Sequence, residues 1–538
     1  MNVDVHFKKC YNKIRKLLNM AKENNMDQEL KKEFQADLAE FHLMTRKFYQ
    51  KEISVKEYKG FSGGFGSYAQ RGGGSSMLRL RFTGGEITKD KLQFIADSVE
   101  KYKIDKLHLT TCQTVQVHNL NDVTVSSLIE EAFEHDIITR GGGGDFPRNV
   151  MVSPLSGVEK EEYFDVLPYA REAADYLLTF IKRVKMPRKL KVCFSNSPKN
   201  ITHATFRDLG FVARKDHTFD VYSAGGLGNN PKMGVLVDEG TDPSKVLYYI
   251  KAMILTFIQH GNYENRGKAR TRYMQDTLGQ EGYRAAFLEN LSKAMAEDSL
   301  DLNVQEVPVT KEGCGFLEEN FRITAQKQDG LYSVLYHPFG GNIPPELIAP
   351  INEAVQKMDQ VVLRISPDES LYFINCNKEE ALELLELTKD SASNLFETSV
   401  ACIGSGICQI GLRDSQKLYK AVMDKIRPLD FSNGVLPQIH ISGCPSSCGT
   451  HQIGTLGFRG ATKVIDKKPL AAFQLYIGGE ETQGNAQFGE DAGTILETDI
   501  PDFLIEIGQA VQKEHKLYSD WIKENPDALK AIIQKYTK

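Results

Sequence analysis

The chain has 538 residues, which is too long for one hydrophobic core and predicts several domains or a duplicated architecture. Hydrophobic residues make up 41% and charged residues 25%, the balance of an ordinary globular protein. The formal net charge of -5 lacks the basic surplus of a general nucleic-acid-binding protein, so no nucleic-acid partner is expected. The N-terminal residues are charged and lack an apolar signal core, and the most apolar window, residues 246–258, contains Lys251. We therefore expect a cytoplasmic protein without a membrane partner.

The first third of the chain alternates helical, glycine-rich and strand-like segments. Residues 1–54 are rich in Lys and Glu with helically spaced apolar positions, which predicts a helical N-terminal extension. After a glycine-rich loop, the segment MLRLRFTGG predicts a strand with Leu and Phe on one face and Arg79 and Arg81 on the other. A helix, a strand and a second glycine run follow, then a strand-rich region at 186–222 and a long helical stretch at 242–298.

The second half of the chain repeats the first. Residues 78–121 and 333–377 both follow the pattern strand, Gly-Gly-x-Ile turn, helix, strand, strand. A second pair of similar segments, LGFVA…FDVYSAGGLGNN and LGFRG…FQLYIGGEETQGN, follows at matching places. We therefore predict two fused halves, each an α/β plait followed by an α/β domain, with a ligand where the halves meet.

Two cysteine pairs lie in glycine-rich turns of the second half. CIGSGIC carries Cys402 and Cys408 with a five-residue spacer, and GCPSSCG carries Cys444 and Cys448 with a three-residue spacer. Four thiolates from two such turns are the usual ligands of an iron–sulfur cube. Zinc is the main alternative, although zinc knuckles usually have two-residue spacers. The remaining cysteines, of nine in all, are scattered and predict isolated thiols rather than disulfides.

Cationic residues of the first half form a candidate anion site. Lys189 and Lys191 share one face of a predicted strand, Arg79 lies on the polar face of its own strand, and Arg148 follows a Gly/Pro loop. Any one of them alone is more often part of a solvated surface. Brought together in a compact unit without acidic neighbours in sequence, they indicate a bound anion.

From about residue 55 to about residue 500, the chain resembles the siroheme- and [4Fe-4S]-containing sulfite/nitrite reductases. The cysteine pattern with GCPxxCG carries most of the resemblance, together with the MLRLR, FPRNV, MPRKLK and NRGKARTRY segments. It implies an α+β fold with pseudo-twofold duplication. The expected parts are a helical extension (1–54), a ferredoxin-like half-repeat (55–150), a siroheme- and substrate-binding α/β domain (151–324), a second half-repeat (325–400) and a cluster- and siroheme-binding α/β domain with C-terminal helices (401–538).

The resemblance also implies two cofactors and a set of site residues. The cluster ligands are Cys402, Cys408, Cys444 and Cys448, and Cys448 also bridges to the iron of siroheme. The anion-binding residues are Arg79, Arg148, Lys189 and Lys191. Further cofactor contacts are expected from Arg71, Gln113, His118, Asn149, Gly225, Gly226, Asn230, Arg266, Arg270, Gly478 and Gly479.

The chain departs from the family where two arginines commonly hold siroheme carboxylates. His108 and Cys112 stand there instead, so part of the anchoring is expected from Arg71, Arg140, Arg266 or Arg270. Ser447 replaces a frequent Asn, and Phe146 stands where some members carry a cysteine that is cross-linked to a tyrosine, so no such link is expected at Tyr68.

The implied activity is the six-electron reduction of sulfite to sulfide. Lys191 favours sulfite, because nitrite-selective members carry Asn there, and nitrite reduction to ammonia is the alternative. No flavin or nicotinamide domain is visible, so an external donor is expected, either a small acidic ferredoxin or a separate flavoprotein subunit. A haem-less iron–sulfur electron-transfer or sensor protein is a third hypothesis.

Overall fold

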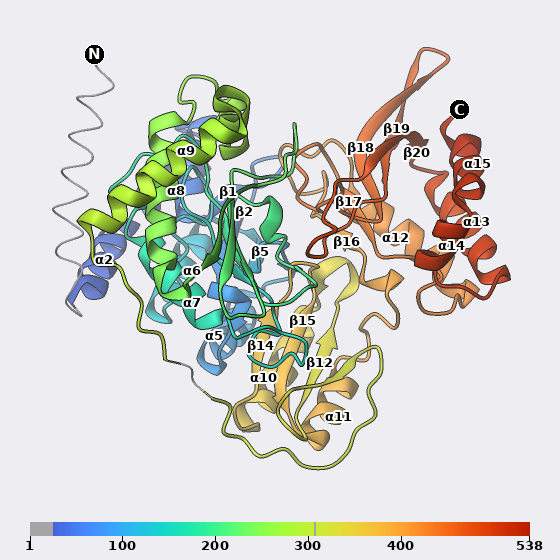
Figure 1. The fold of residues 1–538 in the computed structure, drawn as a ribbon, viewed down its shortest axis with the longest axis horizontal. Helices are drawn as coiled ribbons and strands as arrows, with labels where there is room; N and C mark the ends of the chain where they lie inside the picture. Colours follow the sequence, from blue (N-terminus) through green and yellow to red (C-terminus); the bar gives the residue numbers. More distant parts are fainter. Residues whose placement is uncertain (1–24, 306–307) are drawn as a thin grey trace.

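The computed structural model describes residues 25–305 and 308–538, in which the strands form four five-stranded sheets (Figure 1). Cys10 and the other residues of the predicted N-terminal extension before residue 25 lie outside the described residues. The described part of that extension is helical, with α2 (Asn25–Ala36) and α3 (Leu38–Tyr49), and α4 (Val55–Ser62) follows.

Two of the sheets are plaits. The first has the strand order β1-β2-β5-β4-β13 and the second has the order β11-β12-β15-β14-β3. The first consists of β1 (Ser67–Ala69), β2 (Ser76–Arg81), β4 (Leu107–Leu109) and β5 (Thr114–Leu120), with helices α5 (Lys89–Tyr102) and α6 (Asp122–Glu134). The second consists of β11 (Ile323–Ala325), β12 (Tyr332–Tyr336), β14 (Val362–Ile365) and β15 (Leu371–Cys376), with α10 (Pro345–Lys357) and α11 (Lys378–Leu387).

Each plait receives its last strand from the other half. β3 (Glu86–Ile87) and β13 (Asn342–Ile343) come from the two Gly-Gly-x-Ile turns and pair antiparallel with β14 and β4 respectively. The predicted strand faces are confirmed, because Leu78, Leu80 and Phe82 are all buried. These side chains belong to one hydrophobic core that also contains residues of β12, β14 and β15. The exchange therefore joins the two halves through both main-chain hydrogen bonds and a shared core.

The other two sheets have identical topology, and the predicted duplicated α+β architecture is thereby confirmed. Their orders are β10-β9-β8-β7-β6 and β16-β17-β18-β19-β20, and in both the first three strands along the chain are parallel and the rest antiparallel. The first contains β6 (Met151–Val152), β7 (Val192–Ser195), β8 (Leu209–Ala213), β9 (Phe219–Ser223) and β10 (Val235–Thr241), with α7 (Leu167–Leu178), α8 (Val246–His260) and α9 (Met274–Glu297). The second contains β16 (Val400–Ala401), β17 (Ile439–Ser442), β18 (Leu456–Ile465), β19 (Lys468–Ile477) and β20 (Glu490–Leu496), with α12 (Ser415–Ile426), α13 (Ile500–Lys513), α14 (Tyr518–Glu524) and α15 (Pro526–Thr537).

The long helical stretch expected at 242–298 is interrupted after α8. α8 ends at His260, and α9 begins at Met274. Between them, the NRGKARTRY segment forms short turns, because Arg270 and Thr271 are held by the buried carboxylate of Asp208 rather than by helical hydrogen bonds. The apolar window in α8 is buried in the core, and no helix among the described residues has the length and apolarity needed to cross a bilayer.

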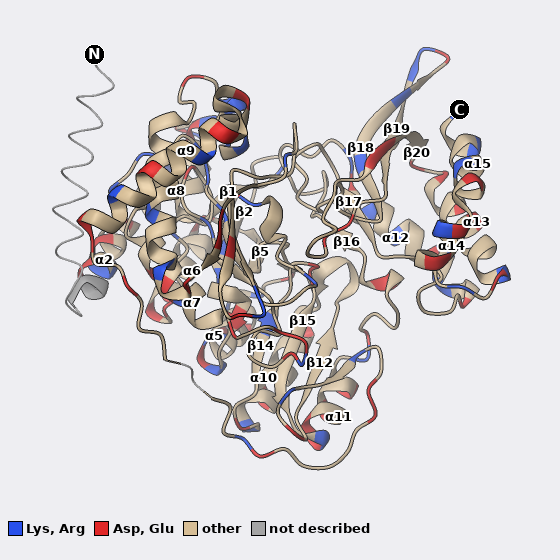
Figure 2. Ribbon diagram, in the orientation of Figure 1, with Lys and Arg blue, Asp and Glu red and all other residues tan. Residues whose placement is uncertain are grey.

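The β18–β19 hairpin extends well beyond the body of the second α/β domain (Figure 1). Lys467 and Lys468 lie at its turn, and Figure 2 shows basic residues along its outer end. Val464, near the same end, is 67% exposed, so the outer part of the hairpin adds nothing to the core.

A buried glutamine links the first plait to the neighbouring parts of the molecule, and its substitution tests this junction. Gln113, between β4 and β5, donates through Nε2 to the carbonyls of Val152 (2.7 Å) and Ile365 (2.6 Å) and accepts from the N–H of Val152 (2.9 Å). We expect Gln113→Ala to lower the free energy of unfolding by about 3 kcal/mol, because it leaves several buried backbone groups without partners. Calorimetric melting checks this, with Gln534→Ala on the exposed side of α15 as the control. Equal melting curves for both variants would contradict the expectation.

Candidate active site

The two cysteine turns lie at the same edge of one sheet. β16 and β17 are parallel neighbours, so the turns that follow them start side by side. The N–H of Gly443 donates to Sγ of Cys402 (3.3 Å), and the N–H groups of Leu412 and Arg413 donate to the carbonyl of Gly443. A Cβ at Gly449 would lie 2.1 Å from the carbonyl oxygen of Ile441, so glycine is required for the turn to pack this closely.

The thiols influence one another electrostatically. Burial, together with the charge of Cys448, raises the pKa of the Cys402 thiol to about 12. Burial also raises the pKa of Cys448, with Cys444 and Cys408 acting in the same direction and Lys189 opposing them. Four mutually repelling thiolates need a positive group between them, as iron provides.

In the described ranges, no group of three or more His, Cys, Asp or Glu side chains is placed to hold a single metal ion. A cube of iron and sulfide spans more space and binds each thiolate at a separate corner.

Arg71 reaches across from the first half to the first cysteine turn. Its guanidinium donates to the carbonyls of Cys408 (3.0 Å) and Gly411 (2.7 Å), and its backbone N–H donates to the carbonyl of Ile407 (2.9 Å). The sequence suggested this arginine as an anchor for a siroheme carboxylate. In the structure it joins the glycine-rich loop after α4 to the loop that carries Cys408.

Two arginines of the first half converge on one carbonyl. Arg79 donates to the carbonyl of Gly142 at 2.6 Å, and Arg148 donates to the same oxygen at 2.7 Å and to Gly144 at 2.8 Å. Burial and the charge of Arg79 lower the pKa of Arg148. The Nε atoms of both arginines are buried without a partner. The glycine run thus orients the two guanidinium groups and leaves donors available for a ligand.

The two lysines lie next to this pair. The N–H of Arg148 donates to the carbonyl of Leu190 (2.8 Å), which is the residue between Lys189 and Lys191. Burial lowers the pKa of Lys189 well below its usual value, and the charges of Arg270 and Arg148 add to the effect. Burial likewise lowers the pKa of Lys191. Such lysines lie in a strongly positive field, which a bound anion would relieve.

One carboxylate lies close to these cations, and its hydrogen-bonding capacity is already in use. Asp208 accepts from Arg270 (3.0 Å), from the hydroxyl of Thr271 and from the backbone N–H of Lys191 (2.8 Å). Its side chain is fully buried. Asp208 therefore positions Arg270 and the Lys191 backbone and does not neutralise the pocket as a whole.

Cys112 adds a thiol to the same pocket. Burial raises its pKa, but the charges of Lys191 and Arg207 outweigh burial and bring the pKa to about 6. The neighbouring Thr111 donates to the carbonyl of Cys448 at 2.9 Å. The turn between β4 and β5 thus places the cationic pocket of the first half against the second cysteine turn, and Lys189 lies within electrostatic range of Cys448.

The remaining predicted cofactor residues fall into three groups. The side chains of Gln113, His118 and Asn149 are hydrogen bonded inside the protein, Asn149 to the carbonyls of Phe82, Cys112 and Gln113. The exposed Arg266 pairs with Asp145, and Asn230 donates to Asp276. Gly225, Gly226, Gly478 and Gly479 lie in turns, and the first of these turns reaches the second cysteine turn, since a Cβ at Gly228 would lie 3.6 Å from the carbonyl oxygen of Pro445.

Two arginines in the site were missed by the sequence reasoning. Arg207 is buried, and its charge acts on both Lys191 and Cys112. Arg272 is buried too, and its Nη1 has no partner although its Nε and Nη2 bind backbone carbonyls of the turn at 229–230. The one available signal was the NRGKARTRY segment, which contains Arg272.

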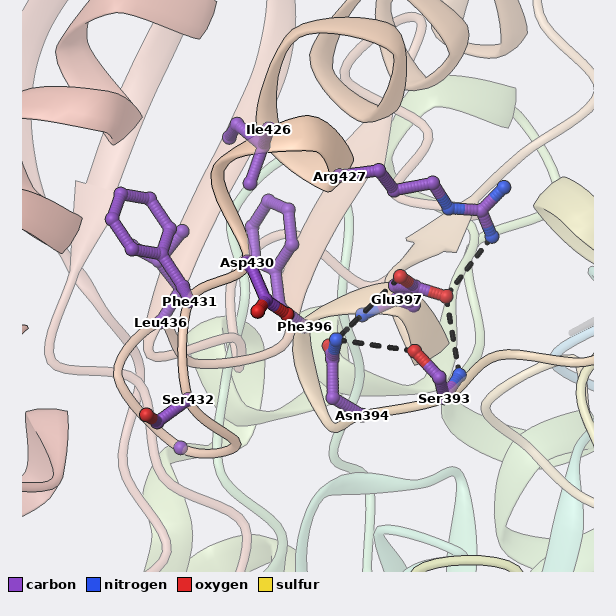
Figure 3. Close-up of a pocket in the computed structure, with 11 residues that line it drawn as sticks. Ser393, Asn394, Phe396, Glu397, Ile426, Arg427, Asp430, Phe431, Ser432 and Leu436 are labelled. Carbon is purple, nitrogen blue, oxygen red and sulfur yellow. Dashed lines mark hydrogen bonds and ion pairs between the residues drawn. The ribbon is translucent and has the colours of Figure 1, made fainter.

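The described cavities lie outside this pocket. One, of about 80 Å³, lies in the second α/β domain beside the ion pair between Arg427 and Glu397 (3.0 Å), and Figure 3 shows its lining. It is lined by none of the four cysteines and none of the pocket cations, so we assign it no part in the site. A second cavity, of about 230 Å³, is described below.

The residues present fit a carboxylate-rich tetrapyrrole beside a cluster. Nε of Arg270 and Nη1 of Arg272 are buried donors without partners, and they follow a turn that approaches the cysteine loops. Buried donors of this kind need acceptors, and carboxylates supply them.

Comparisons with known proteins agree with this geometry. The family model described as the nitrite and sulphite reductase 4Fe-4S domain matches residues 143–295, and that of the nitrite/sulfite reductase ferredoxin-like half domain matches 68–134. The chain is 25% identical over 422 residues to a chloroplastic ferredoxin–nitrite reductase of Arabidopsis thaliana, covering 76% of this chain and 71% of the relative. It is 23% identical over 485 residues to the sulfite reductase [NADPH] hemoprotein beta-component of Chromohalobacter salexigens, covering 79% and 80%.

A solved structure shares the fold. The Mycobacterium tuberculosis NirA protein superimposes with a TM-score of 0.75 at 21% identity, covering 95% of this chain and 99% of that chain. The chain is therefore an oxidoreductase that is similar to the nitrite and sulfite reductases, and the matched domain models indicate siroheme and a [4Fe-4S] cluster as its cofactors. Both matched ranges lie before residue 300, in the half that carries the cations rather than the cysteines.

Arg71 offers a test of how the cluster loop is held. We expect Arg71→Ala to leave the protein folded but to lower its iron content, because three hydrogen bonds to the loop of Cys408 are lost. Iron and acid-labile sulfide per chain measure this directly. Arg46→Ala, which removes an exposed arginine of α3, is the matched control. Full iron loading in Arg71→Ala would show that these hydrogen bonds are not needed to hold the cluster.

Proposed function

We propose that this protein catalyses the six-electron reduction of sulfite to sulfide. The observation that carries the proposal is the convergence of Arg79, Arg148, Lys189 and Lys191 beside the turn of Cys448. A pocket with so many cations and one fully engaged carboxylate suits a small dianion.

We propose the following roles toward the cofactors. Cys402, Cys408, Cys444 and Cys448 would hold the cluster, and Cys448 would also face the siroheme. Arg270 and Arg272 donate to siroheme carboxylates through their free N–H groups. When bound, the siroheme and the cluster would supply the electrons for the reduction.

The side chains of the pocket hold the anion and provide protons. Arg79 and Arg148 are oriented by the glycine-run carbonyls, so they require little reorganisation when the anion binds. Lys189 and Lys191 have lowered pKa values, which makes each ammonium a better proton donor to an anion oxygen than an ordinary lysine. Loss of oxygen as water requires such donors.

We propose an external protein as electron donor, of the ferredoxin type. The curated relatives named ferredoxin–nitrite reductases support this choice, while the relative from Chromohalobacter salexigens is named as a component of an NADPH enzyme. Oxidation of reduced ferredoxin on addition of sulfite, compared with a reduced flavoprotein donor, distinguishes the two.

A substitution at Lys191 tests whether the protein prefers sulfite to nitrite. We expect Lys191→Asn to lower kcat/KM for sulfite by about 10- to 100-fold, the effect of losing one charge-assisted contact, and to lower that for nitrite less. Steady-state assays with reduced methyl viologen measure both substrates. If Lys191→Asn leaves the ratio of kcat/KM for sulfite to kcat/KM for nitrite unchanged, the argument for sulfite is removed. If the unmodified protein is inactive with both anions, the proposed function itself is contradicted.

Nitrite is the second candidate, and Cys112 favours it. A thiolate at Cys112 offsets part of the charge of Lys191, which leaves a field better matched to a monoanion. Most of the similar curated relatives shown by the comparison carry the name ferredoxin–nitrite reductase.

The balance between the two anions can be tested at Cys112. Because its pKa is about 6, the thiol is ionised at pH 7.5 and mostly protonated at pH 5.5. We expect Cys112→Ser to raise the preference for sulfite over nitrite about three-fold relative to the unmodified protein at pH 7.5, and to leave it unchanged at pH 5.5. The same effect at both pH values would show that the thiolate charge is not responsible.

A further inference from the structure

A second cavity lies between the halves of the molecule. Its volume is about 230 Å³, enough for several water molecules. The lining residues come from both α/β domains and the second plait, and the polar ones among them include His203, Asp368, Gln438, His440 and Glu481.

This cavity occupies the place that corresponds to the anion pocket under the internal duplication. Gln438 directly precedes β17 as Lys191 directly precedes β7, and Asp368 lies in the turn between β14 and β15 as Cys112 lies in the turn between β4 and β5. The two sites differ in charge. Cations line the first, whereas carboxylates and imidazoles line the second.

A line of short polar contacts runs from the second cavity to Arg207, whose charge acts on the anion pocket. Nη2 of Arg207 lies 2.8 Å from Nδ1 of His203, and Nε2 of His203 lies 2.6 Å from Oε2 of Glu481. Because the guanidinium can only donate, Nδ1 of His203 accepts and Nε2 carries the proton toward Glu481. At the other end, Arg207 acts on Lys191 and Cys112.

The neighbouring chain segments hold this line in place. Arg207 also donates through Nε to the carbonyl of Thr202 (3.0 Å), and it is buried. His203 stacks on Phe206, with ring centroids 5.4 Å apart. Asn200 donates to the carbonyl of Glu481 at 2.8 Å, so the turn at 480–487 of the second half stays against the loop at 198–203 of the first.

We propose that Arg207, His203 and Glu481 are positioning residues that couple the protonation of the second cavity to anion binding at Lys191. The inference rests on the proposed anion pocket and extends it. When Glu481 carries a proton, the charge of Arg207 is not compensated and strengthens the field at Lys191. When Glu481 is a carboxylate, it offsets that charge through His203 and the anion binds more weakly.

The groups around Glu481 set the pH at which this change occurs. Burial raises its pKa to about 8, the charge of His440 opposes this, and those of Asp368 and Glu480 add to it, while Arg207 lowers it. Its side chain is 33% exposed and lines the cavity, so solvent can supply the proton. Anion affinity is therefore expected to fall as the pH rises through about 8.

The test measures the dissociation constant of nitrite between pH 6.5 and 9.5, a range in which nitrite stays a monoanion. Binding is followed by the change that nitrite causes in the visible spectrum of the oxidised holoenzyme. The unmodified enzyme is expected to lose about three- to ten-fold in affinity across this range. The Glu481→Gln variant has no ionisable group at this position. At pH 9.5 it is therefore expected to bind nitrite about three-fold or more tightly than the unmodified enzyme does.

Glu480→Gln is the matched control, since it alters the adjacent carboxylate, which accepts from the N–H groups of its own turn. It should keep the pH dependence with a shifted midpoint.

A second readout is independent of the cofactors. The thermal midpoint of the unmodified protein should fall more between pH 6 and pH 9 than that of Glu481→Gln. The reason is that a folded protein with a carboxyl of raised pKa loses stability as the pH rises toward that pKa.

The outcomes separate the two proposals. If nitrite and sulfite fail to bind the unmodified enzyme at every pH, the proposed anion pocket is wrong. If they bind, and Glu481→Gln shows the same pH dependence as the unmodified enzyme, the coupling through Arg207 is wrong and the pocket stands.

Discussion

The feature on which the rest of this structure depends is positive charge gathered in a partly buried pocket. Arg79, Arg148, Lys189 and Lys191 gather where the halves meet, and burial together with mutual repulsion lowers the pKa values of Arg148 and both lysines. Such an arrangement costs free energy in the absence of a ligand. Backbone carbonyls of the glycine run and the carboxylate of Asp208 offset part of that cost while leaving donors free.

The fold keeps this pocket aligned with the cysteine turns. The pocket belongs to the first half and the cysteines to the second, so any sliding of one half against the other would separate them. The exchanged strands β3 and β13 prevent this, because each plait needs the other to complete its sheet and its core. Gln113 and Thr111, at one turn, extend the same connection to β14 and to the turn of Cys448.

The duplication also explains why two sites of opposite charge occupy corresponding places in the two halves. The same strand order brings the same loops together twice, once with cations and once with Asp368, Glu481 and two histidines. Because the backbone is shared, the difference lies in the side chains that the loops carry. Arg207 and His203 lie between the two places and give the acidic cavity a route by which its charge can act on the cationic one.

The sequence by itself determined the features that short patterns carry. The cysteine turns, the alternation around Arg79, the lysine pair and the repeat of the Gly-Gly-x-Ile turn are local, and the helix and strand periods follow from them. The duplicated α+β architecture was predicted on this basis, and so were the cations that converge. The helix break after His260 was not, since it depends on a distant carboxylate, Asp208.

Only the tertiary structure decided which polar side chains face the pocket and which hold the protein together. Asn149 and Arg71 look like ligand residues in the sequence, but in the structure their donors bind carbonyls from other segments. Arg207 looks ordinary in the sequence, and Cys112 stands out there only as a departure from the family pattern, yet the charges of both act on Lys191. The physical reason is that a hydrogen bond or a charge acts over a few ångströms in space, and the residues that meet here are separated by long stretches of chain.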